Sequence, residues 1–189
     1  MTTVASNAAI SAGMFEGWEN YYLMVGSSAG ALIGLMFVVV TLTAGRDRAE
    51  VEYGKHLYTS PIVWHLAVIL TLSGIAAVPG MSARIFGLMS GGLAVLGLGW
   101  GARSAVGIAR RPGAPDAARF DMFWYGVAPA IVYAGLGIAA FGLLSAKPWG
   151  TVAVAASLMA LLLVSIHAEW DLVTYLAPTS GQPPSDNNS

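Results

Sequence analysis

Five long apolar runs constrain this chain more than any other feature of its sequence. A helix that crosses a bilayer needs about 20 mostly apolar residues, because the hydrocarbon core is about 30 Å thick and each helical residue rises about 1.5 Å. Five segments meet that requirement, at about 21–43, 61–78, 84–106, 120–144 and 149–175. We therefore predict an all-α, polytopic membrane protein with five transmembrane helices.

The composition agrees with lipid as the surrounding solvent. Only 10% of the 189 residues are charged, whereas a soluble domain carries about 25%. The chain has no Cys, which excludes disulfides and every Cys-ligated metal or iron–sulfur centre. The net charge of −1 gives no support for nucleic acid as a partner.

The breaks between the runs have recognisable turn chemistry. Pro61 can occupy a first helical position without losing a hydrogen bond. Pro79 and Gly80 end the second run tightly, which predicts a hairpin between the second and third helices. Beyond Ala177 the chain is polar and proline-rich, so we predict a single domain at 1–177 and a disordered tail at 178–189.

The positive charges predict the orientation. Seven lie in or next to the loops after the first and third helices, and two lie on the opposite side. Short cytoplasmic loops are enriched in Lys and Arg, so we expect the N-terminus outside and the C-terminus in the cytoplasm. The seven are Arg46, Arg48, Lys55, Arg103, Arg110, Arg111 and Arg119, and the two are Arg84 and Lys147.

Ionisable side chains gather where the helices reach the predicted cytoplasmic boundary. Away from their ends the five helices contain no Asp, Glu, Lys or Arg, which argues against proton-coupled transporters, pumps and voltage sensors. His65, His167 and Arg103 reach a similar depth near the boundary. Asp171 lies four residues after His167, so these two side chains share one helix face.

This boundary cluster admits three interpretations. The first is an interfacial layer in which His65, His167, Asp171 and Arg103 bond to each other and to headgroup water. The second is a metal site built from the two histidines and Asp171, since imidazole and carboxylate suit zinc or iron. The third is a haem held between His65 and His167.

No sequence motif supports catalysis. The chain has no nucleophile elbow, no His-Glu-x-x-His, no P-loop and no dinucleotide fingerprint. The glycine-rich stretches lie inside apolar runs, where they favour close helix packing rather than phosphate binding. We assign no catalytic residue and no enzyme activity.

Glycines spaced four apart form the most specific pattern in the chain. Gly26, Gly30 and Gly34 mark one face of the first helix, and Gly87 and Gly91 repeat the spacing on the third. Small residues allow helices in lipid to approach closely. The face can pack against the third helix of the same chain, against a second copy of itself, or along a pore.

The first helix also carries a resemblance. The segments WENYY at 18–22 and GALIGLMFV at 30–38, with Gly26 between them, resemble the opening of a group of small bacterial inner-membrane proteins of unknown function. The resemblance covers about 25 residues and implies a bacterial inner membrane, and it supplies no catalytic residues. The glycine spacing is similar to that of the glycine-zipper helices of mechanosensitive channels, as a packing pattern only.

Two functions follow as expectations. The first is a homo-oligomer with a channel-like role, in which the boundary cluster acts as a gate or selectivity ring. The second is a structural or accessory subunit of a larger membrane complex, holding haem or a metal through His65 and His167. In either case membrane lipids surround the protein.

Overall fold

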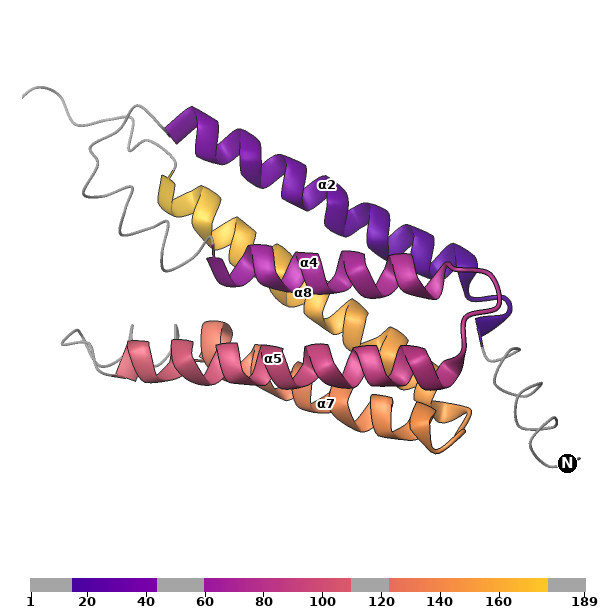
Figure 1. The fold of residues 1–189 in the computed structure, drawn as a ribbon. Helices are drawn as coiled ribbons and strands as arrows, with labels where there is room; N and C mark the ends of the chain where they lie inside the picture. The colour runs from indigo at the N-terminus through magenta and orange to yellow at the C-terminus, as the bar shows by residue number, and fades with distance from the viewer. Residues whose placement is uncertain (1–14, 44–59, 110–122, 177–189) are drawn as a thin grey trace, which may run out of the picture.

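A computed structural model describes residues 15–43, 60–109 and 123–176, and these residues form helices joined by short turns (Figure 1). The all-α prediction is confirmed, with each helix within a few residues of its predicted ends. The helices are α2 (Glu19–Thr43), α4 (Ser60–Ala76), α5 (Ala83–Ala109), the π-helix η3 (Phe123–Val127), α7 (Ala128–Leu144) and α8 (Trp149–Leu176).

Several sequence predictions lie outside the described residues. The tail at 178–189 is one, and six of the seven charges that predict the orientation are others. The predicted orientation therefore stays a prediction. Those six charges are Arg46, Arg48, Lys55, Arg110, Arg111 and Arg119.

Four of the helical segments are long and apolar enough to cross a membrane, and the chain is an integral membrane protein on that basis. These segments begin in α2, α5, η3 and α8. The fifth helix, α4, has 17 residues, which is about 26 Å of helix and close to the lower limit for a span. It is shorter than the sequence suggests because it ends at Ala76, before Pro79.

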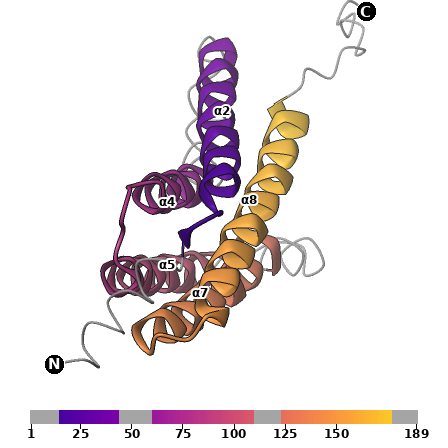
Figure 2. The same ribbon diagram turned by 90° about the vertical axis from the view of Figure 1, so that its right-hand side faces the viewer.

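The helices pack in two groups that α8 connects. α2 lies along α4, and α5 lies along α7. α8 packs on α7 at one end and crosses to α2 and α4 at the other (Figures 1 and 2). Near the start of α8 there is a further link to α2, because the hydroxyl of Tyr21 donates a hydrogen bond to the carbonyl of Ala155 over 2.6 Å.

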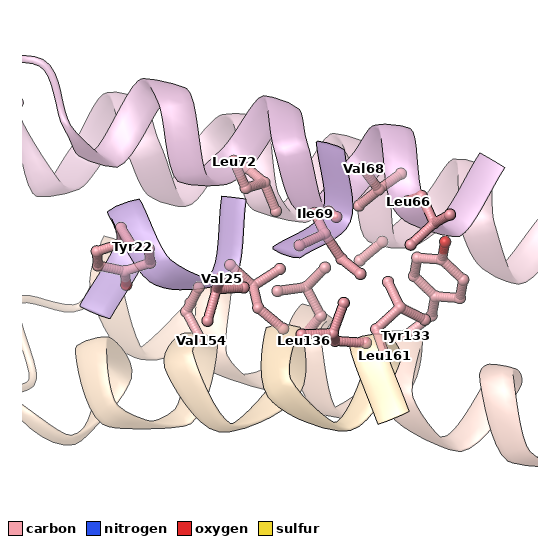
Figure 3. Packing of buried hydrophobic residues seen from close by; sticks show 14 of the residues in the cluster. Tyr22, Val25, Leu66, Val68, Ile69, Leu72, Tyr133, Leu136, Val154 and Leu161 are labelled. Carbon is pink, nitrogen blue, oxygen red and sulfur yellow. The ribbon is translucent and has the colours of Figure 1, made fainter. Parts of the chain in front are cut away.

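The core lies where α2, α4, α7 and α8 meet (Figure 3). Val25 of α2, Ile69 of α4 and Leu136 of α7 are almost completely buried there. Lipid tails are as apolar as these side chains, so close van der Waals packing rather than escape from water holds the helices together. Because these side chains pack closely, the polar groups near the core have fixed neighbours.

Short turns join α4 to α5 and α7 to α8. Gly80 has φ +69° in the turn between α4 and α5, a conformation that favours glycine. Between α7 and α8 the backbone of Gly150 lies against the backbone of Gly142 and Leu143, so closely that a Cβ atom would not fit. Both hairpin turns therefore require their glycines.

The glycine series of the first and third helices do not meet each other among the described residues, so the alternative in which they pack together within one chain is wrong there. A Cβ atom on Gly26 would lie 2.9 Å from Cβ of Ser73 in α4. On Gly87 it would lie 3.2 Å from the carbonyl oxygen of Ala140 in α7, and Gly91 faces the same alanine. The glycines of α5 pack against α7, which occupies this face of α5 in place of α2.

Candidate functional site

The boundary cluster is the candidate site, and the structure divides it into two pairs of helices. His65 of α4 is buried, and its Nδ1 atom lies 2.9 Å from the hydroxyl oxygen of Tyr133 in α7. Their ring centroids are 5.5 Å apart, and Figure 3 shows Tyr133 between α4 and α7. Tyr133 was not among the predicted site residues, because nothing in the sequence shows which helix it faces.

The second part of the boundary cluster joins α8 to η3. His167 and Asp171 share a face as predicted, with 3.5 Å between His167 Nε2 and Asp171 Oδ2. Tyr125 donates a hydrogen bond to the same carboxylate oxygen over 3.2 Å. The ring of Trp124 lies on the imidazole of His167, with 4.0 Å between centroids. Each side chain of the His167–Asp171 pair therefore also has a neighbour on η3.

The π-turn of η3 sets this geometry. Pro129, near the start of α7, has no backbone N–H and cannot make the hydrogen bond that continues a regular helix. The chain before it forms the wider π-turn, a feature often found at functional sites. Two consecutive residues of η3, Trp124 and Tyr125, can then both reach α8. In the sequence, Pro129 was the feature that could have indicated this irregular turn.

The two histidines have different neighbours. His65 contacts Tyr133, and His167 contacts Trp124 and Asp171. Among the described residues no group of three His, Cys, Asp or Glu side chains could hold a metal ion. A bis-histidine haem would require both imidazoles to leave these neighbours. The haem and metal interpretations gain no geometric support from the described part of the chain.

Arg103 lies apart from the other predicted members. Its side chain is exposed on α5, and no described hydrogen bond or ion pair joins it to His65, His167 or Asp171. We use the term polar layer for the five residues that do make such contacts: His65, Tyr125, Tyr133, His167 and Asp171. Hydrogen bonds across helices hold each of the two parts in place, the first between α4 and α7 and the second between α8 and η3.

One ionisable residue of the boundary was missed by sequence reasoning. Glu169 lies between His167 and Asp171 in sequence, yet it points to the opposite side of α8 and is only 6% exposed. It lines a hollow against α2 rather than joining the polar layer. No sequence pattern indicated its burial, because the burial depends on where α2 crosses α8.

The glycine face of α2 is the other candidate surface. Gly30 and Gly34 have no atom within 4 Å of the place where a Cβ atom would lie. Ser27 and Ala31, at the intervening positions of the same face, are also exposed. Of the predicted packing glycines of α2, only Gly26 has an intrachain partner among the described residues.

Searches against protein-family models, curated protein sequences and solved structures found no significant match.

Proposed function

We propose that this integral membrane protein assembles into a homo-oligomer through α2 and that the assembly has a channel-like role. The observation that carries the proposal is the small-residue face of α2, defined as Ser27, Gly30, Ala31 and Gly34. These residues follow the i, i+3, i+4, i+7 spacing of one helix face. The face lies outside the intrachain packing described above.

The burial of the helices supports α2 as the assembly helix. Only 22% of the spanning window of α2 is buried inside the chain, against 44% for α8. In lipid, small residues favour helix association because they let two backbones approach closely. A second copy of α2 supplies the same flat surface, so the contact can be symmetric, as most homo-oligomer contacts are.

The polar layer is the proposed gate of such a channel. It lies toward the ends of α4 and α8 that the positive charges predict to be cytoplasmic. Hydrogen-bonding side chains next to a weakly polar passage can set which solutes enter. The proposed location is the bacterial inner membrane, which the resemblance of the first helix implies.

Solute flux through reconstituted vesicles tests the channel. We expect the purified protein to release a small trapped ion, and Gly30→Leu to abolish most of that flux. Gly30 has open space around it, so leucine fits the single chain and obstructs only the contact between copies.

Gly92→Leu is the matched control, because Gly92 of α5 is also exposed and also has open space around it. It should leave the flux unchanged. Vesicles that remain tight with the original protein would rule out the channel. If the protein instead co-purifies with a larger complex, the result would favour the accessory-subunit function, with the face of α2 occupied by a different protein.

A further inference from the structure

Glu169 is the buried acidic side chain that the proposed function does not use. It lies in α8, seven residues before the helix ends at Leu176, which is about 10 Å from that end. The side chain is 6% exposed, and its Oε1 atom has no hydrogen-bond partner among the described residues. A carboxylate ion in that position would lose the hydration of this oxygen without compensation, and an unpaired buried charge is costly.

The surroundings of this carboxyl group are apolar. It lines a hollow between α2 and α8, which we call the α2–α8 seam. Met36 and Leu172 are buried in its wall, and Leu35 is half exposed at its edge. The complete lining is Leu35, Met36, Val39, Glu169, Leu172 and Val173. Among the described residues, no other side chain with an oxygen or nitrogen atom lines the hollow.

The size and lining of the hollow restrict what the carboxyl group can bind. Its volume is about 10 Å³, close to the smallest space that admits one water molecule. A hard metal cation needs six or more oxygen ligands, and in the described lining only Glu169 has a side-chain oxygen. An organic cation is too large for the space. A proton neutralises the carboxylate and needs no additional volume.

We propose that Glu169 is a proton-binding site in the α2–α8 seam, and that release of its proton draws water into the seam and loosens the contact between α2 and α8. The neutral carboxylic acid can remain among Met36, Leu172 and their neighbours at modest cost. The ion cannot remain there without water or a cation. The contact between the two helices therefore depends on the protonation of one side chain.

Among the described residues, no charged side chain other than Glu169 lines the α2–α8 seam. On α2 the described residues that follow the hollow, up to Thr41, include no titratable side chain. On α8 the nearest titratable groups, His167 and Asp171, are each two positions away in sequence and therefore point to other faces. They contact η3 instead. The proposal concerns the single chain and holds whether or not copies associate through α2.

Infrared spectroscopy of the full-length protein in lipid tests the protonation directly. At pH about 7 an ordinary glutamate is ionised. We expect the spectrum to contain a carboxylic acid C=O band at that pH, and Glu169→Gln to remove it. Asp171→Asn is the control and should leave that band in place. If Glu169→Gln removes carboxylate bands instead, the side chain is ionised and the proposal fails.

Cysteine cross-linking tests the loosening, since the chain has no Cys of its own. One pair, Leu35→Cys with Val173→Cys, reports the seam. A reference pair, Ala94→Cys with Gly137→Cys, reports the α5–α7 contact, where a Cβ atom on Gly137 would lie 3.8 Å from that of Ala94. The ratio of seam to reference cross-linking should fall at least twofold as the pH rises through deprotonation. With Glu169→Gln it should stay constant, and a constant ratio in both proteins would overturn the coupling.

Discussion

At the scale of single residues, Tyr133 connects three helices. It lies on α7, its hydroxyl contacts His65 of α4, and its ring covers Gly97 of α5. The side chain is completely buried, so neither contact can be replaced by water. A polar pair in such a position fixes the relative placement of its helices, because each alternative arrangement leaves a donor or acceptor without a partner.

We expect Tyr133→Phe to lower the free energy of unfolding by about 1 kcal/mol, because it leaves Nδ1 of His65 buried without a partner. Titration with denaturing detergent measures the change. Tyr22→Phe is the control: the hydroxyl of Tyr22 is buried and has no hydrogen-bond partner in the described structure, so its removal should cost nothing. Equal losses in the two variants would contradict the role given to the His65–Tyr133 bond.

At the scale of helices, the glycines of α5 explain why α5 and α7 lie so close together. Gly87 and Gly97 allow the backbone and side chains of α7 to occupy the space where side chains of α5 would be. Gly92 and Gly99 lie on the exposed side of the same helix, where no described atom lies within 4 Å of the place a Cβ atom would take. The same residue type therefore has a packing role on one face and no contact on the other.

We expect Gly97→Ala to destabilise the protein by about 1–3 kcal/mol, the usual cost of overfilling a packed interior. The new methyl group would overlap the ring of Tyr133, and this ring cannot move without breaking the hydrogen bond between Tyr133 and His65. Gly99→Ala makes the same chemical change in open space and should be neutral. The comparison uses the same detergent titration, and a neutral result for both would mean that α5 and α7 are loosely packed.

The sequence predicted the helices well and their partners poorly. Apolar length located the helices, and Pro79 with Gly80 marked a break, because each depends on local chemistry. The pairing of α2 with α4 and the burial of Glu169 depend on how α8 crosses the bundle, which no local pattern encodes. The π-turn of η3 lies between these cases, since Pro129 signals an irregularity without specifying its form.

At the scale of the whole molecule, α8 joins the α2–α4 group to the α5–α7 group, and α2 lies at the edge of the bundle (Figure 2). This placement leaves the small-residue face of α2 free of the described intrachain contacts. The α2–α8 seam lies on another face of α2, against α8 of its own chain. One helix would thus have a contact between copies and a protonation-dependent contact within each copy.

The mass of the protein in a lipid nanodisc, measured by native mass spectrometry, tests assembly through α2 most directly. We expect the original protein and Gly92→Leu to give one defined multiple of the 19.6 kDa chain, and Gly30→Leu to give the single chain. A single-chain mass for the original protein, or an unchanged multiple for Gly30→Leu, would contradict the proposed assembly.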